Sequence, residues 1–285
     1  MSQITLKSYD TGRKPVWCPG CGNFAILTAF KRALYELKIR PEKVVVVSGI
    51  GCHGRITGYV KTNSIHTIHG RVLPIATGIK LANHELLVFG FAGDGDAYAI
   101  GLGHLPHAAR RNIDIKYVVH NNMVFGLTTG QVTPTTPVGV KTRSTPYGNV
   151  EQPLNPLALA LASGATFVAR GFSGDVNHLT YLFKEAIKHK GFAFIDVLQP
   201  CYTFYNTYSY FRERVYKLEE AGHDPTNLEE ALKKAYEWNN RIPIGIFYKV
   251  KRPTFEELKD ALRRGPLARR NIEDVDITGI YEVFR

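Results

Sequence analysis

Residues 85–130, which read ELLVFGFAGDGDAYAIGLGHLPHAARRNIDIKYVVHNNMVFGLTTG, decide the fold. An apolar run at 86–91 predicts a buried strand, and this run stops at the letters GDGD. Apolar residues at helical spacing follow over 97–109, and a second β-type run at 113–120 stops at the letters NN. The stretch therefore predicts a β-α-β unit with a carboxylate after its first strand and an amide after its second.

Polar side chains at these two strand ends suggest a cation site. Asp94 follows the first strand and Asn122 follows the second. A right-handed crossover makes the two strands near neighbours, so the two side chains can face one another at the ligand-binding edge of a sheet. With a main-chain carbonyl from the loop after Asn122, they would offer three oxygens to Mg²⁺. Phosphates and water usually complete the coordination shell of this ion. Gly93 and Gly95 would let a diphosphate approach the start of the helix. An ordinary Asp-Gly turn is the alternative.

Outside this unit, strands and helices alternate in both directions. An apolar pattern over 24–37 predicts a helix, and the valines at 44–47 predict a central strand buried on both faces. Residues 53–72 are rich in turn-forming residues and are expected to form a loop. Further on, 176–188 predicts an amphipathic helix and 192–198 another buried strand. These elements predict an α/β fold with a mostly parallel sheet and helices on both faces.

The spacing of GDGD and NN resembles the thiamine-diphosphate motif. A longer set of segments, occurring together and in order, resembles the β subunit of the 2-oxoacid:ferredoxin oxidoreductases. The segments are WCPGCG at 17–22, GIGCHGR at 49–55, HTIHGR at 66–71, GDGDAYAIGLGH at 93–104 and GLTTGQ at 126–131. The resemblance covers roughly residues 10–218 and implies a thiamine-diphosphate-binding fold.

The resemblance also implies roles for individual residues. The carbonyl of Val124 matches the third protein ligand of Mg²⁺, and His69 matches a histidine near the diphosphate. Arg55 resembles a basic residue near the opening through which CoA or substrate enters. Thr129 stands where many relatives have a lysine, and this departure puts CoA as the acceptor in question. Further cofactor contacts are expected from Ile50, Gly51, Cys52, His53, Gly95, Asp96, Gly126 and Leu127.

The four cysteines of the chain are Cys18, Cys21, Cys52 and Cys201. In a cytoplasmic setting, metal or redox use is favoured over disulfides. Cys52 and Cys201 follow predicted parallel strands and should reach the same sheet edge as Asp94, where the Cys-x-x-Cys loop could complete a four-thiolate site. A [4Fe–4S] cluster or Zn²⁺ suits such a site, and buried or dithiol cysteines are a third possibility. The matching cysteines of the family bind the cluster, so the resemblance implies it here.

The alternation of strands and helices weakens after Cys201. We therefore place the thiamine-diphosphate- and Mg²⁺-binding α/β domain, with its Fe–S ligands, at 1–201. Residues 202–285 are expected to form a C-terminal extension that packs on the core and on a partner subunit. Within it, 228–238 predicts a helix and 242–250 a strand.

Composition and charge limit the other classes of function. The formal net charge is +11, but the lysines and arginines are scattered and form no helix-turn-helix or zinc-finger pattern. Nucleic acid is therefore not an expected partner, whereas an acidic electron-transfer protein and an anionic cofactor would suit the charge. No apolar run approaches the ~20 residues of a membrane span, and the N-terminus lacks the apolar part of a leader. We expect a cytoplasmic protein without membrane contact.

The resemblance implies oxidative decarboxylation of a 2-oxo acid with CoA, giving acyl-CoA and CO₂. Electrons would pass from thiamine diphosphate through a [4Fe–4S] cluster to ferredoxin. Thiamine enzymes also need a carboxylate against the aminopyrimidine, normally from a second α/β domain, and this chain has room for one such domain. That catalytic carboxylate is therefore expected on an α subunit, in a heterodimer or a dimer of heterodimers, and this chain alone should be inactive.

Two other functions remain open from the sequence. The first is a subunit of a non-oxidative thiamine-dependent decarboxylase or synthase with a structural zinc. The second is an iron–sulfur electron carrier that kept the fold without enzymatic activity. The sequence does not indicate whether pyruvate, 2-oxoglutarate or another 2-oxo acid is preferred.

Overall fold

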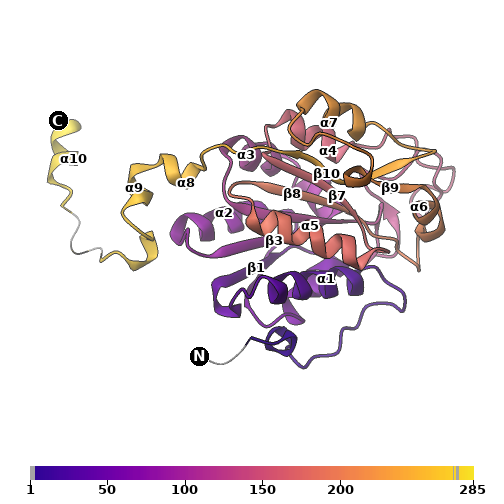
Figure 1. Ribbon diagram of the computed structural model, residues 1–285, viewed down its shortest axis with the longest axis horizontal. Helices are drawn as coiled ribbons and strands as arrows, with labels where there is room; N and C mark the ends of the chain where they lie inside the picture. The colour runs from indigo at the N-terminus through magenta and orange to yellow at the C-terminus, as the bar shows by residue number, and fades with distance from the viewer. Residues whose placement is uncertain (1–3, 272, 274–275) are drawn as a thin grey trace.

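The valine run forms most of β1 (Val44–Ser48), and every residue of this strand is buried. In the computed structural model, which describes residues 4–271, 273 and 276–285, β1 belongs to an eight-stranded sheet. The strand order is β2-β1-β3-β4-β8-β7-β10-β9, and Figure 1 shows helices on both faces. The predicted α/β fold with a mostly parallel sheet is confirmed.

The other strands come from segments spread along the chain. They are β2 (Asn63–His66), β3 (Leu87–Gly93), β4 (Ile115–Asn121), β7 (Phe167–Phe172), β8 (Ala193–Leu198), β9 (Val215–Lys217) and β10 (Ile242–Lys249). From β2 to β7 the neighbouring strands are parallel, whereas β10 runs antiparallel to β7 and pairs in parallel with β9. A separate hairpin joins β5 (Val124–Phe125) to β6 (Gln131–Val132). The carboxyl ends of β1, β3, β4 and β8 therefore meet at one edge.

The two faces of the sheet carry different helices. Val44 and Val46 share a core with α1 (Asn23–Glu36) and α5 (Val176–Lys188). The alternate residues, Val45 and Val47, point into a second core. The helices of that second core are α2 (Val72–Ala82), α3 (His104–Arg111), α4 (Pro156–Ala162) and α7 (Leu228–Ala235). The helix predicted at 176–188 is confirmed as α5.

The loop predicted at 53–72 is wrong in part. Cys52–Gly58 form a 3₁₀ helix, and Asn63–His66 form the edge strand β2, which pairs with β1. All four side chains of β2 are exposed, so its sequence carries no alternation of apolar and polar residues. Only its pairing with β1 identifies it as a strand.

The helical pattern at 97–109 also forms two pieces instead of one. A π-helical turn spans Asp96–Ile100, and α3 begins only at His104. The backbone is tightly packed between them, because a Cβ on Gly101 would lie 2.4 Å from the Asp96 carbonyl oxygen and 3.1 Å from that of Gly70. This close approach brings the loop around Gly70 against the turn that carries Asp96.

Part of the C-terminal extension belongs to the sheet, since β9 and β10 both lie beyond residue 201. The remaining helices there are α6 (Tyr208–Arg214), α8 (Phe255–Leu258), α9 (Asp260–Arg263) and α10 (Thr278–Val283). In Figure 1 the yellow segment with α8, α9 and α10 extends away from the sheet. Residues 1–3 of the predicted domain and residues 272, 274 and 275 of the predicted extension lie outside the described residues. Within the described part, no helix is both long and apolar enough to span a membrane.

Candidate active site

The predicted site residues gather where four neighbouring strands end. Cys52 follows β1, Asp94 follows β3, Asn122 follows β4 and Cys201 follows β8, and these strands are adjacent in the sheet. The Asn122 backbone N–H donates to Asp94 Oδ1 at 3.4 Å. The structure therefore brings these strand ends together at one edge, as predicted.

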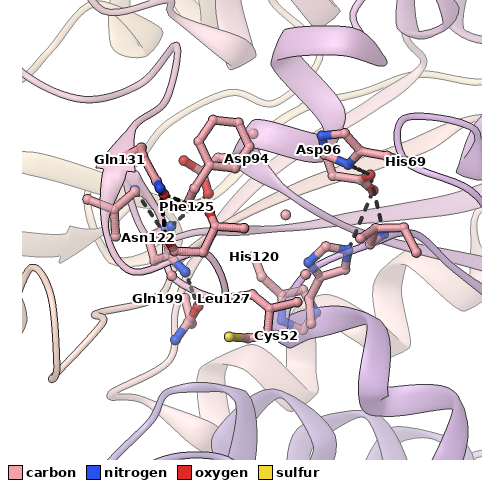
Figure 2. A pocket seen from close by; sticks show the side chains of 18 residues that line it. Cys52, His69, Asp94, Asp96, His120, Asn122, Phe125, Leu127, Gln131 and Gln199 are labelled. Carbon is pink, nitrogen blue, oxygen red and sulfur yellow. Dashed lines mark hydrogen bonds and ion pairs between the residues drawn. The ribbon is translucent and has the colours of Figure 1, made fainter. Parts of the chain in front are cut away.

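A cavity of about 470 Å³ opens at this edge (Figure 2). Figure 2 shows Asn122 and Gln131 on one side of it and His69 on the other. The cavity is lined by every residue expected to contact thiamine diphosphate or Mg²⁺, namely Ile50, Gly51, Cys52, His53, His69, Asp94, Gly95, Asp96, Asn122, Val124, Gly126 and Leu127. Gly93, predicted to let a diphosphate approach, also lines the cavity, and the lining residues that we did not single out from the sequence are His120, Phe125, Thr128, Gln131 and Gln199.

Asp94 is a buried carboxylate whose partners are all neutral. Its Oδ2 accepts a hydrogen bond from Thr135 Oγ1 at 3.0 Å, and its Oδ1 accepts from the backbone of Asn122. Among the described residues, no lysine, arginine or histidine forms an ion pair with it. Burial raises the pKa of Asp94 to about 6, although these hydrogen bonds act in the opposite direction. A cation in the cavity would offset the cost of burying this charge.

Asn122 and Val124 form a tight turn beside Asp94. Asn122 Oδ1 accepts from the Val124 N–H at 3.1 Å, and Asn122 Nδ2 donates to Gln199 Oε1 at 3.3 Å. Met123, between them, has a φ of +63°, in the left-handed region that few non-glycine residues adopt. The turn keeps the backbone of Val124 next to the Asn122 side chain, so the three proposed oxygen donors come from one small region.

A second carboxylate, Asp96, joins the opposite wall of the cavity. Its Oδ1 lies 2.7 Å from His69 Nδ1 and accepts from the Gly70 N–H at 2.7 Å. Its Oδ2 lies 3.5 Å from His53 Nε2, and both of these atoms are buried without a hydrogen-bond partner. Burial alone would raise the pKa of Asp96, but the two imidazoles and the Gly70 N–H hold it below its usual value.

The glycines around the cavity make room for these side chains. A Cβ on Gly49 would lie 1.8 Å from Asp96 Oδ2, and one on Gly93 would lie 2.7 Å from His53 Nδ1. A Cβ on Gly95 would lie 2.1 Å from Phe125 Cε1. Glycine is therefore required at these positions by the packing of the site itself.

A smaller cavity of about 250 Å³ adjoins the first, and all four cysteines and Arg55 line it. Burial raises the pKa of Cys21 to about 11, and the three other thiols act in the same direction. Gln199 Nε2 lies 3.5 Å from Cys21 Sγ. Within the described part of the chain, no three histidine, cysteine or acidic side chains converge closely enough to hold one metal ion. The four thiols therefore share one cavity.

The two cavities share a wall that contains Gly126. Both are also lined by Cys52, Asn122, Leu127 and Gln199. A Cβ on Gly126 would lie 3.7 Å from Cys201 Sγ and 3.8 Å from Cys52 Sγ. Groups bound in the two cavities would therefore be separated only by a thin layer of protein.

Thr129 is apart from both cavities. It is exposed, is not among the lining residues of either cavity, and has a φ of +79°. A β-branched residue in this region is strained.

His120 and Gln199 are the lining residues with the clearest sequence signal that we overlooked. His120 immediately precedes the Asn-Asn pair, and Gln199 immediately follows β8. Burial lowers the pKa of His120 well below its usual value, and its Nδ1 lies 2.7 Å from Asn23 Oδ1. A polar residue at the end of a predicted parallel strand was the available signal in both cases.

The fold and the cavity fit the class of thiamine-diphosphate enzymes, and the comparison with family models identifies this class. The family model for the thiamine pyrophosphate enzyme C-terminal TPP binding domain matches residues 49–197, which is more than half of the chain. Thiamine pyrophosphate is another name for thiamine diphosphate. A second model, for the C-terminal part of the pyruvate ferredoxin oxidoreductase beta subunit, matches residues 200–264.

Comparison with individual proteins identifies the family within the thiamine-diphosphate enzymes. A 2-oxoacid:ferredoxin oxidoreductase subunit beta from Saccharolobus solfataricus is 52% identical over 246 residues, covering 81% of each chain. A 2-oxoglutarate synthase subunit KorB from Methanocaldococcus jannaschii is 40% identical, covering 88% of this chain and 94% of that one. The structure of a 2-oxoglutarate:ferredoxin oxidoreductase from Magnetococcus marinus, with 2-oxoglutarate, coenzyme A and succinyl-CoA bound, superimposes with a TM-score of 0.92 at 36% identity, covering 100% of this chain and 97% of that one. This chain belongs to the family of 2-oxoacid:ferredoxin oxidoreductase β subunits, as the resemblance predicted.

Proposed function

We propose that this chain holds thiamine diphosphate with Mg²⁺ in the larger cavity and a [4Fe–4S] cluster in the smaller one. As a β subunit of its family it acts with an α subunit, in an oxidoreductase that decarboxylates a 2-oxo acid. The observation that carries the proposal is the pair of adjoining cavities, one with a buried carboxylate that forms no ion pair among the described residues and the other lined by four thiols.

The larger cavity suits a metal–diphosphate group. Asp94, Asn122 and the Val124 carbonyl would hold Mg²⁺, which accepts such oxygen ligands and shares the rest of its shell with phosphate. His69 and the backbone around Gly95 would contact the diphosphate. When bound, thiamine diphosphate supplies an electron sink for the loss of CO₂ from the substrate.

The smaller cavity suits a cluster better than zinc. A structural zinc usually has two pairs of cysteines close in sequence, whereas here one Cys-x-x-Cys pair is joined by two distant cysteines. The four thiols line one cavity of about 250 Å³. Cys18, Cys21, Cys52 and Cys201 are the proposed cluster ligands, and four free thiols agree with the expected cytoplasmic location.

The remaining assignments concern partners. We propose that the α subunit supplies the carboxylate that activates the cofactor, that CoA is the acyl acceptor, and that ferredoxin takes the electrons. Arg55 lies at the smaller cavity, where a cation suits an anionic substrate or CoA, whereas the uncharged Thr129 offers no charge to a phosphate. Several relatives are named for 2-oxoglutarate, but no residue described here selects one 2-oxo acid.

The composition of the purified complex tests this function. The chain would be purified anaerobically with its α subunit, and Fe, Zn and thiamine diphosphate would be measured per β chain together with the visible spectrum. We expect about four irons and about one thiamine diphosphate per chain. Zinc with thiamine diphosphate would indicate non-oxidative chemistry. Iron without thiamine diphosphate would indicate an electron carrier, and neither cofactor would refute the proposal.

A further inference from the structure

A series of buried hydrogen bonds connects Asp94 to residues that do not line the larger cavity. Its first member is Thr135, in the long segment after β6. Thr135 Oγ1 lies 3.0 Å from Asp94 Oδ2 and 2.9 Å from Asn121 Oδ1. Thr135 is 4% exposed, Asn121 is 3% exposed and Asp94 is 2% exposed, so water does not substitute for these contacts.

The orientation of Asn121 is set by a second carboxylate. Asn121 Nδ2 donates to both oxygens of Asp196 at 3.2 Å, which leaves Asn121 Oδ1 facing Thr135. Tyr98 OH donates to Asp196 Oδ1 at 2.6 Å. Arg170 is the neighbour of Asp196 in the β7–β8 register, so the buried carboxylate has a nearby cation. Asp196 is therefore held independently of the cavity, and it fixes the amide that faces Thr135.

The Thr135 hydroxyl has one hydrogen and lies within reach of the Asp94 and Asn121 oxygens and of the Thr133 hydroxyl, which is 3.3 Å away and can donate or accept. It can donate to Asp94 or to Asn121, but not to both fully. A carboxylate is the stronger acceptor, so the hydrogen is better placed on Asp94, and the nearby Asn121 amide restricts the position of the hydroxyl.

The backbone that carries Thr135 is fixed by other bonds. Thr136 Oγ1 donates to the Met123 carbonyl at 2.6 Å and accepts from the Thr133 N–H at 2.7 Å. Asn149 Nδ2 donates to the Thr136 carbonyl at 2.9 Å. Removing the Thr135 hydroxyl should therefore leave this segment in place.

We propose that Thr135, oriented by Asn121 and Asp196, is a positioning residue that aims the Asp94 carboxylate at the bound cation. The inference rests on the proposed function, since it concerns the affinity for thiamine diphosphate with Mg²⁺. Residues that hydrogen-bond a metal ligand typically contribute about 10- to 100-fold to metal affinity. Thr135 reaches Asp94 from a distant part of the sequence and contributes no atom to the cavity lining.

Three substitutions in the complex with the α subunit test this role. Thr135→Val removes the hydroxyl at constant shape, Thr135→Ser retains it, and Thr135→Ala serves if valine prevents assembly. Thr142→Val is the matched control, because Thr142 Oγ1 accepts from the Thr145 N–H at 3.2 Å in the same segment and no contact links it to Asp94. Each complex would be stripped of cofactor with a chelator and titrated calorimetrically with thiamine diphosphate in excess Mg²⁺, and its melting temperature recorded without cofactor.

We expect Thr135→Val to raise the Kd for thiamine diphosphate by about 10- to 100-fold, with Thr135→Ser and Thr142→Val close to the unsubstituted complex. Equal Kd values for Thr135→Val and the unsubstituted complex would overturn the inference. A Kd that rises only in parallel with a falling melting temperature, in Thr142→Val as well, would also overturn it, because loop stability would then be the cause. If the unsubstituted complex binds no thiamine diphosphate, the proposed function itself fails.

Discussion

Asp94 and Asp114 are largely buried carboxylates at opposite ends of the same sheet. Asp114 immediately precedes β4 and accepts hydrogen bonds from Lys116 Nζ at 2.5 Å and from the Gly191 N–H at 3.2 Å. Lys80 Nζ lies 2.8 Å from its other oxygen. Burial alone would raise the pKa of Asp114, but the two ammonium groups hold it well below its usual value. Asp94, by contrast, has a raised pKa and only neutral partners.

The difference separates a structural charge from a functional one. At the amino end of the strands, the chain supplies the counter-charges itself, and Lys116 also donates to the carbonyls of His189 and Gly191. At the carboxyl end, buried atoms such as His53 Nε2 lack partners within the described residues. Substitutions at the amino ends of the strands should therefore lower the stability of the fold. Substitutions at the carboxyl ends should weaken cofactor binding and change the stability little. The four predictions below test this division.

The largest effect is expected from Asp94→Ala. Loss of the buried carboxylate should weaken thiamine diphosphate binding by more than about 100-fold, because Asp94 is the one charged group among the three proposed Mg²⁺ ligands. The cofactor-free complex should melt at the same temperature or higher, since an uncompensated buried charge is removed. Bound cofactor after gel filtration and thermal melting measure the two effects. Retention of normal thiamine diphosphate would refute the Mg²⁺ assignment.

Cys201→Ser should remove most of the iron from the complex. A serine oxygen is a poor substitute for a thiolate in a four-cysteine cluster site, so the visible absorption should bleach. Thiamine diphosphate content should remain, because Cys201 lines only the smaller cavity. Tyr202→Phe, a neighbouring change in the same cavity, is the control and should keep its iron. Full iron in Cys201→Ser would mean that the fourth ligand is wrongly assigned.

Asp114→Asn should destabilise the fold by about 3–5 kcal/mol at pH 7, because Lys80 and Lys116 would remain buried without their carboxylate. Because the folded state has the lower pKa, the contribution of Asp114 is complete above its unfolded pKa of about 3.9 and declines below it. The difference between variant and unsubstituted complex should therefore shrink as the pH falls below about 4. Urea unfolding across this pH range measures it.

Affinity for thiamine diphosphate should be unchanged in Asp114→Asn wherever the complex is folded. A selective loss of cofactor, without a loss of stability, would contradict the division between the two ends of the sheet.

The smallest effect is expected from Thr129→Gly. Glycine adopts a φ of +79° without the penalty that a β-branched residue incurs, so the complex should gain up to about 1 kcal/mol of stability. Thr128→Gly is the control at a neighbour without positive φ, and it should lose about 0.5–1 kcal/mol. The two melting temperatures should move in opposite directions. A loss of stability in both variants would show that Thr129 is not strained.

Local patterns in the sequence were sufficient to predict most of the sheet and the strand ends at which the proposed cation-site residues lie. The valine run of β1 is continuous, β-branched and buried throughout, and the apolar residues of α5 recur at helical spacing, so both segments encode their own secondary structure. The strand ends then followed from those patterns. Asp94, Asn122, Cys52 and Cys201 could be assigned to one edge because parallel strands all end on the same side.

Tertiary structure alone decided the partners of these residues. The edge strand β2 and the antiparallel β10 depend on pairing with distant strands, and a short exposed strand has no hydrophobic alternation to reveal it. The contact of Thr135 with Asp94 likewise depends on which segments the folded chain brings together. The same is true of the two lysines that pair with Asp114 and lower its pKa, whereas Asp94 has no such partner among the described residues. Periodicity is a property of neighbouring residues, whereas hydrogen bonding and charge compensation in a buried site depend on residues far apart in sequence.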